Sequence, residues 1–233
     1  MKKLISLFTV VLFVLGVSAQ LKITVPGVKW DDTYLFDRYN TFKMEFYSKK
    51  KELMRTVEYY TYYQSKGNNF NVVIMTEKHA MGIETVIDKN NQVAIKIYHD
   101  ESGKPICNAG GYKMPEEKDL KKLELTPTSE TKEVLGYACK KYTYTFKKIF
   151  GEVWIAEKNK TPNDLGVFRA CKMAALHNTL SVDGFLMEMT TEDATGAKTL
   201  MKTVSLNNTD KYLMDFKKVE MSTAINKINY YSF

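Results

Sequence analysis

The sequence has few of the residues from which catalytic and metal sites are usually built. It holds three cysteines, three histidines and two tryptophans in 233 residues. The histidines (His79, His99 and His177) are far apart and no Cys-x-x-Cys pair occurs, so no zinc pattern is recognisable. No glycine-rich loop has the spacing of a phosphate-binding motif. These absences predict a protein that has no metal, no cofactor and no enzymatic activity.

Long hydrophobic runs are also scarce, and the one that occurs lies at the N-terminus. Lys2 and Lys3 precede the apolar stretch LISLFTVVLFVLG, which is shorter than the roughly 20 residues that span a bilayer. Small residues at 17–19 then match a cleavage site. We therefore expect residues 1–19 to be a signal peptide cleaved near Ala19, with a membrane anchor as the alternative. The mature chain is expected in the periplasm or outside the cell, without a transmembrane span.

Acidic side chains are outnumbered, but the excess of positive charge is modest. Lysine and arginine total 34 against 27 aspartates and glutamates, a formal net charge of +7. The lysines are scattered apart from the run at 49–51, and an exported protein seldom meets nucleic acid, so no nucleic-acid partner is expected. A solvated surface is the simpler interpretation. The alternative is attraction to anionic lipid head groups, about 1 kcal/mol per lysine near a charged membrane.

The odd number of cysteines limits how many disulfides can form in an oxidising compartment. At most one internal disulfide can form, and the candidates are Cys139 paired with Cys171 or with Cys107. A cysteine nucleophile would need a nearby base and a lowered pKa, and no histidine stands at a recognisable spacing. A disulfide and a buried thiol therefore remain the two interpretations of Cys139. In the strand expected there, Cys139 is one residue out of phase with Tyr142 and Tyr144.

The mature chain has the alternation of β-strands through most of its length. Residues 41–47, TFKMEFY, alternate strictly between apolar and polar side chains, which is typical of a strand with one wet face. Residues 85–99, 133–157 and 184–207 each read as a hairpin with a polar or glycine-containing turn. These local connections predict an antiparallel meander.

Other segments depart from this alternation. Residues 114–125 and 161–178 have the composition of short helices, and residues 101–112 read as a loop. The tail from 210 to 233 is ambiguous between a helical stripe and extended chain. No linker divides the rest, so residues 20–209 are expected to be one domain. The expected fold is mainly β: a strongly curved antiparallel sheet of about eight to eleven strands with two or three short helices.

Aromatic and methionine residues are abundant: 15 tyrosines, 12 phenylalanines and 12 methionines. Aromatics favour strands, so they could simply fill a core. The alternative is that a curved sheet leaves part of its apolar face lining a cavity, where methionine adapts to irregular ligands. Chosen by face, the candidate lining residues are Phe42, Met44, Phe46, Tyr142, Tyr144, Trp154, Met187 and Met189.

Three motifs carry a family resemblance: TSETKEVLGYACKKY, GEVWIAEK and GFLMEM. With them, about residues 34–206 resemble an uncharacterised family of exported domains common in Bacteroidota. The strand order of that family is similar to the LolA-like lipoprotein carriers, open half-barrels in which a curved sheet wraps a hydrophobic cavity closed by helices. The resemblance implies such a half-barrel and assigns no catalytic residue.

The leading hypothesis is an exported periplasmic protein that binds a lipid-like or lipoprotein-acyl ligand in a hydrophobic cavity, without catalysis. Such a site needs apolar area more than polar motifs, because each buried CH₂ contributes about 0.8 kcal/mol. The alternative is a cell-envelope module that binds another protein through exposed tyrosines and the C-terminal tail. A hydrolase with an unrecognised site ranks third.

Overall fold

The structure, a computed structural model, describes residues 29–67, 69–76, 79–99, 101–112, 123–159, 181–218 and 220–225. Side chains are not described for residues 70–76, 79–83, 218 and 220–225. The described chain is mainly β, and its sheets are antiparallel except for one strand pair. None of its helices has the length and apolar character needed to cross a membrane.

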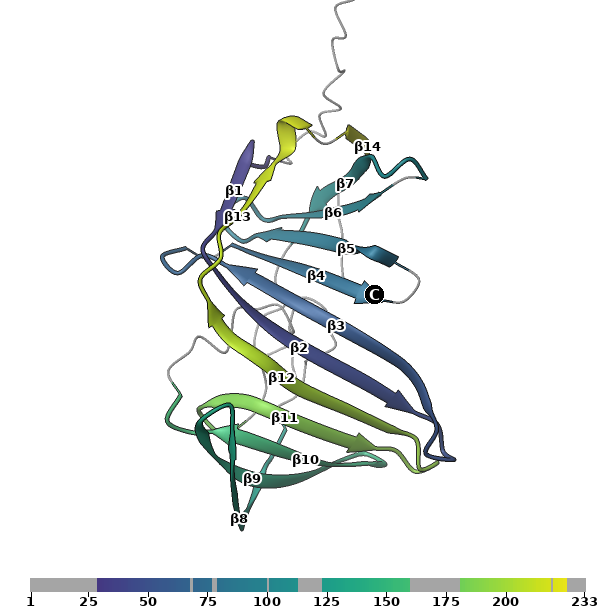
Figure 1. The fold of residues 1–233 in the computed structure, drawn as a ribbon, viewed down its shortest axis with the longest axis vertical. Coiled ribbons are helices and arrows are strands. Elements are labelled where there is room, and N and C mark those ends of the chain that lie inside the picture. Colours follow the sequence, from purple (N-terminus) through teal and green to yellow (C-terminus); the bar gives the residue numbers. More distant parts are fainter. Residues whose placement is uncertain are drawn as a thin grey trace, which may run out of the picture.

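Twelve of the described strands form one sheet in the order β14-β7-β6-β5-β4-β3-β2-β12-β11-β10-β9-β8 (Figure 1). The first half is a meander of β2 (Arg38–Tyr47), β3 (Leu53–Tyr63), β4 (Phe70–Thr76), β5 (His79–Asp88), β6 (Val93–His99) and β7 (Pro105–Gly111). The second half is a meander of β8 (Thr126–Val134), β9 (Tyr137–Phe146), β10 (Ile149–Ala156), β11 (Phe185–Glu192) and β12 (Lys198–Asn208). Pairing of β2 with β12 joins the halves. The sheet ends at β14 and β8 and does not close.

The predicted hairpins at 85–99, 133–157 and 184–207 are confirmed by the pairing of β5 with β6, β9 with β10 and β11 with β12. A further hairpin joins β8 to β9 through Leu135 and Gly136, which have φ of 53° and 80°. Positive φ at both central residues is the signature of the tight hairpin turn whose twist matches its strands. Gly196, with φ of 85°, lies in the turn between β11 and β12.

Outside the hairpins, the sequence predicts two helices and a loop. Of the expected helices, 161–178 lies outside the described residues and 114–125 nearly so. Within the described chain, only the short 3₁₀ helix η2 (Phe216–Lys218) is present. The loop expected at 101–112 is wrong, because this segment contains β7. Its backbone pairs with β6 on one side and with β14 on the other. The pairing with β14 joins distant parts of the chain, and the glycines and proline of β7 give no local sign of a strand.

The C-terminal segment is built into the fold as far as Ile225. Strand β13 (Tyr212–Asp215) pairs with β1 (Thr33–Phe36) in a separate two-stranded sheet. After η2, strand β14 (Glu220–Ile225) runs parallel to β7. The extended interpretation therefore holds for β13 and β14, and the helical one is limited to the single turn of η2. Residues 219 and 226–233 lie outside the described chain.

The large sheet carries a hydrophobic cluster on each of its faces. Ile87 and Ala94 belong to one cluster, whereas their strand neighbours Val86 and Ile95 belong to the other. Successive side chains of a strand point to opposite faces, so the two clusters lie on opposite sides of β5 and β6. The second cluster packs the β1–β13 sheet against β5, β6 and β7; its buried members are Tyr34, Phe36, Val86, Val93, Ile95, Ile97, Cys107, Ala109, Met214 and Phe216.

A buried carboxylate fastens the two sheets together. Asp88, at the end of β5, is 0% exposed. Its Oδ1 accepts hydrogen bonds from the backbone N–H groups of Asn90 and Asn91, both at 2.9 Å. Its Oδ2 accepts from the Tyr34 hydroxyl of β1 at 2.8 Å and from Asn91 Nδ2 at 2.7 Å. These donors satisfy the charge that burial would otherwise leave without partners.

Candidate functional site

One row of directly paired residues crosses the sheet from β3 to β9 without a charge. Its members, one per strand, are Val57, Met44, Met201, Met189, Val153 and Tyr142. All of them are buried. Directly paired residues share one face of a sheet, and we call this row the methionine row and its side of the sheet the methionine face. It belongs to the first hydrophobic cluster.

The structure brings most of the predicted lining residues together on this face. Strand alternation and register place six of them there: Phe42, Met44, Phe46, Tyr142, Tyr144 and Met189. Met187 is fully buried in the same cluster. The pairing of β10 with β11 skips Met187, which marks a β-bulge at this point.

Trp154 is placed differently from the other predicted lining residues. It lies between Val153 and Ile155 in β10, and the register pairs it with Lys141 and Glu188. Alternation therefore turns its side chain to the opposite face from Val153. Its half-buried ring still packs at the border of the first cluster.

A second row runs beside the methionine row and is more polar. Its members, again one per strand from β3 to β9, are Arg55, Phe46, Thr199, Thr191, Gly151 and Tyr144. We call it the threonine row. Thr191 and Thr199 are half-buried, and Arg55 is exposed. Two residues along each strand, the methionine face thus changes from an uncharged, mainly aliphatic row to one that carries two threonines and an arginine.

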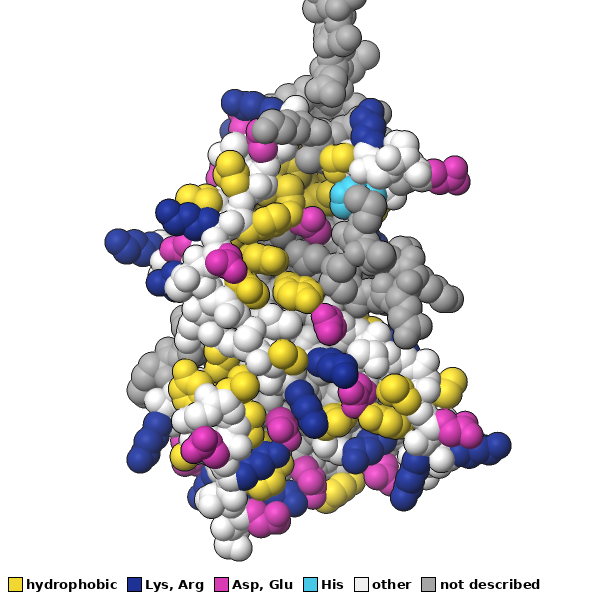
Figure 2. Space-filling view, viewed as in Figure 1, with side chains coloured by type: hydrophobic (Ala, Val, Ile, Leu, Met, Phe, Trp, Pro, Cys, Tyr) yellow, Lys and Arg dark blue, Asp and Glu magenta, His cyan; other side chains and the backbone are white. Residues whose placement is uncertain are grey.

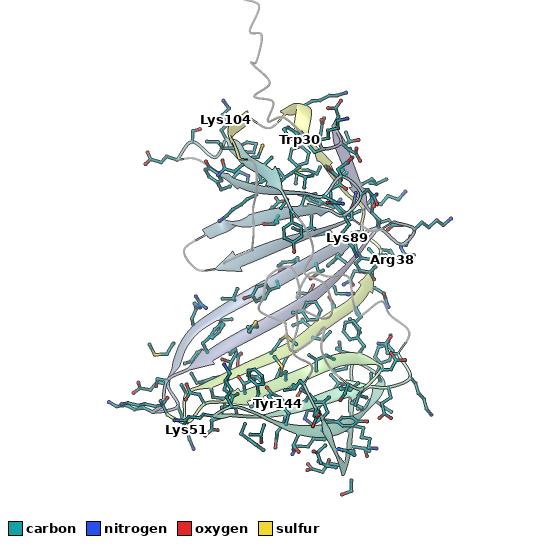
Figure 3. All side chains as sticks on the ribbon, turned by 180° about the vertical axis from the view of Figure 1, so that it is seen from behind. Trp30, Arg38, Lys51, Lys89, Lys104 and Tyr144 are labelled. Carbon is teal, nitrogen blue, oxygen red and sulfur yellow. The ribbon has the colours of Figure 1, made fainter. Side chains whose placement is uncertain are left out.

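The end of the Tyr144 side chain lies over β10 because its direct partner there is a glycine. A Cβ atom built on Gly151 would lie 2.1 Å from Tyr144 Cζ and 2.4 Å from its Oη. Seen from behind, Tyr144 lies over the lower strands of the sheet (Figure 3). The residue is 3% exposed, and its hydroxyl has no hydrogen-bond partner within the described part of the chain. Burial raises the pKa of Tyr144 above its ordinary value, so it stays protonated.

Cationic side chains stand beside aromatic rings at several points on this face. The guanidinium Cζ of Arg55 lies 4.4 Å from the ring centroid of Phe46. Lys140 Nζ lies 5.6 Å from the ring centroid of Tyr142. Such contacts hold a cation next to apolar surface, so positive charge borders the methionine face at the β3 and β9 ends of the rows.

The opposite face of these strands is charged. A row parallel to the methionine row comprises Glu58, Lys43, Lys202, Glu188, Trp154 and Lys141. Figure 2 shows this side, with lysines, arginines and carboxylates scattered over the lower strands and hydrophobic side chains gathered higher up beside β13. Ion pairs join Lys43 to Glu45 at 2.9 Å and Lys132 to Glu188. This face matches an ordinary solvated surface.

Two of the three cysteines lie in the described chain, and both are buried. Cys139 belongs to the first cluster and Cys107 to the second. The Cys139 thiol donates to the backbone oxygen of Tyr137 at 3.2 Å. Burial raises the pKa of the Cys107 thiol to about 11 and also raises that of Cys139, which does not suit a nucleophile at neutral pH. Cys171 lies outside the described residues, so its pairing with Cys139 stays a prediction.

Sequence reasoning missed two residues that shape this site. Met201 alternates in phase with Thr199 and Thr203, but only the pairing of β12 with β11 and β2 shows that it lies beside Met189 and Met44. The role of Gly151 had a weaker signal, a glycine inside a strand, which often marks a close approach of another group. Within the described ranges, no group of three or more His, Cys, Asp or Glu side chains is placed to hold a metal ion.

Comparison with known proteins gives only distant likenesses. No protein-family model matches the chain, and no curated protein matches it. Two crystal structures of PNGF-II, in space groups C2 and P21, superpose with a TM-score of 0.39 and identities of 16% and 17%. The matches cover 81% and 82% of this chain, which spans about a third of PNGF-II (31% and 32%). An uncharacterized conserved protein from Thermus thermophilus superposes with a TM-score of 0.43 and 10% identity, over 82% of this chain and 91% of that one.

Proposed function

We propose that this protein is exported and binds a lipid-like ligand, an acyl chain, against the methionine face, without catalysis. The observation that carries the proposal is the methionine row, an unbroken series of uncharged side chains across neighbouring strands. Successive strands lie about 4.8 Å apart, so the row spans about 24 Å. That length suits an extended chain better than a compact polar substrate.

The chemistry of the row supports an adaptable apolar ligand. Met44, Met189 and Met201 are adjacent across three strands. Methionine has an unbranched, polarizable side chain that repacks readily, which is why it is common at surfaces that accept varied apolar partners. Burying each CH₂ contributes about 0.8 kcal/mol. A chain of about a dozen carbons therefore gains several kcal/mol after the cost of association.

The charges beside the row favour a ligand with an anionic or strongly polar head. Arg55 and Lys140 each lie against a ring of the methionine face. A fatty acid or an acylated lipoprotein terminus would present its apolar chain to the row and its polar end toward the border. The signal-peptide pattern at residues 1–19 and the resemblance to LolA-like half-barrels support the same class of ligand, in the periplasm.

The test begins with native mass spectrometry of the mature protein after gentle purification, followed by titration with a fluorescent fatty acid. Met201→Gln puts a polar amide of similar shape into the methionine row, and we expect it to weaken binding at least fivefold. Lys202→Gln is the matched control, because the adjacent residue points to the opposite face. A protein that carries no lipid and does not bind the fluorescent fatty acid would refute the proposal.

A second function, binding of another envelope protein, is favoured by one separate observation. Leu35 and Leu213 are directly paired in the β1–β13 sheet and are 48% and 60% exposed. Deleting residues 210–233 would not test this function, because the deletion removes β13 and β14. A pull-down with Leu213→Glu is the sharper experiment. Loss of a captured partner with unchanged fatty-acid binding would favour the second function.

A further inference from the structure

We infer that the ligand of the methionine face carries a carbonyl oxygen, and that Tyr144 donates a hydrogen bond to this oxygen. The inference rests on the proposed function, because it assigns the polar part of the same ligand. It concerns a free acid or an ester, which share this acceptor.

The starting point is a buried hydroxyl without a partner. Tyr144 Oη makes no hydrogen bond with any residue that the structure describes, although the residue is only 3% exposed. The great majority of buried polar side-chain atoms in folded proteins have a partner, and each exception calls for an explanation. The neighbouring tyrosine of the same face, Tyr142, shows the usual situation: its hydroxyl donates to Glu157.

The position of this hydroxyl is set by the strand beneath it. Gly151 leaves β10 without a side chain where the Tyr144 ring crosses it. The hydroxyl therefore lies above β10, where a Cβ of residue 151 would be 2.4 Å away. Gly151 is paired on its other side with Thr191 of β11. Tyr144 thus directs its hydroxyl over β10, away from the sheet edge at β8.

The surroundings of Tyr144 determine which kind of group can accept its hydrogen bond. Tyr144 stays protonated, because the cause of its raised pKa is burial. A protonated phenol donates one hydrogen bond, and a carbonyl oxygen is an acceptor that needs no donor of its own. The methionine row lies one step along the strand, at Tyr142 and Val153. A ligand whose chain lies on that row can therefore bring its carbonyl group beside the Tyr144 hydroxyl.

The experiment compares three probes that share one chain length: dodecanoic acid, methyl dodecanoate and dodecane. Each is titrated against the mature protein and against Tyr144→Phe by displacement of a fluorescent fatty acid. The matched control is Tyr60→Phe, which removes a hydroxyl from the opposite face, where Tyr60 donates to Glu58 at 2.9 Å. Tyr144→Phe keeps the ring over Gly151, so the shape of the face is preserved.

We expect Tyr144→Phe to lower the affinity for the acid and the ester about tenfold, the size of one hydrogen bond. Its affinity for dodecane should be unchanged or higher, and Tyr60→Phe should bind all three probes as the parent does. A loss confined to the acid would identify a free carboxylate as the acceptor and would also support the inference. Equal binding of acid and ester by Tyr144→Phe and the parent would overturn it while leaving the proposed function intact. Failure of all three probes to bind the parent protein would overturn both.

Discussion

Replacing Gly151 with alanine tests whether the ring of Tyr144 needs a strand without a side chain beneath it. Alanine normally stabilises a strand relative to glycine by about 0.5–1 kcal/mol, because glycine loses more backbone entropy on folding. At position 151 the added Cβ would lie 2.1–2.4 Å from three atoms of Tyr144. These distances are far below van der Waals contact, and the ring is 3% exposed, so moving it disturbs buried packing. Gly151→Ala must therefore displace a buried ring.

The expected size follows from these opposing effects. Overpacking a core by one methyl group costs about 1–3 kcal/mol, from which the entropic gain of about 0.5–1 kcal/mol is subtracted. We expect a net destabilisation of about 1–2 kcal/mol. In a Tyr144→Val background the steric conflict is gone, and Gly151→Ala should become stabilising by about 0.5–1 kcal/mol. The difference between the two backgrounds corresponds to a coupling of about 1.5–3 kcal/mol between the two positions.

Equilibrium urea denaturation of the four proteins of this double-mutant cycle measures the coupling directly. Gly136→Ala serves as the control. Gly136 has a positive φ of 80° and no atom near an added Cβ, so its cost of about 1–2 kcal/mol is purely conformational and should not depend on Tyr144. A Gly151→Ala protein at least as stable as the parent would refute the packing of Tyr144 over β10.

Two further predictions concern side chains that hold the fold together. Asp88→Ala leaves the Tyr34 hydroxyl without its acceptor and should lower the free energy of unfolding by about 2–4 kcal/mol. Asp88→Asn keeps one acceptor oxygen and should lower it less. Equal effects of the two substitutions in urea denaturation would contradict this account. Burial and the hydrogen bond to Glu157 raise the pKa of Tyr142 from 10.0 to about 12. The folded chain then holds this proton more tightly than the unfolded chain, so the stabilisation is complete below pH 10 and is lost as the pH rises through 12. Tyr142→Phe should flatten this part of the stability profile, and an unchanged slope would count against the raised pKa.

The sequence predicted this fold well where neighbouring residues carry the information. Residues 41–47 alternate in the sequence and in the structure, since a strand with one charged face and one apolar face needs that period. The turns at Gly136 and Gly196 were also readable, because glycine is the residue that adopts positive φ without strain. The alternation of β9 also put Cys139 out of phase with Tyr142, yet the structure buries both side chains in the first cluster.

Other features could not be read from a local pattern. The loop expected around Cys107 is a strand because β6 and β14 pair with it. Trp154 was grouped with Tyr142, but the register turns its side chain to the charged face, and only the pairing of β10 with both of its neighbours shows this. Met201 joined the site for the same reason, through its partners Met44 and Met189.

The sequence by itself determined a mainly β, antiparallel chain and most of the residues of its apolar face, because side-chain alternation is a property of each strand alone. Tertiary structure decided which strands are neighbours, and so which residues form one row. The pairing of β2 with β12 brings Met44 beside Met201 across more than half of the chain. Backbone hydrogen bonding is alike for every strand, so that choice depends on how whole faces pack. The pairing of Tyr144 with Gly151, by contrast, belongs to the local hairpin of β9 and β10.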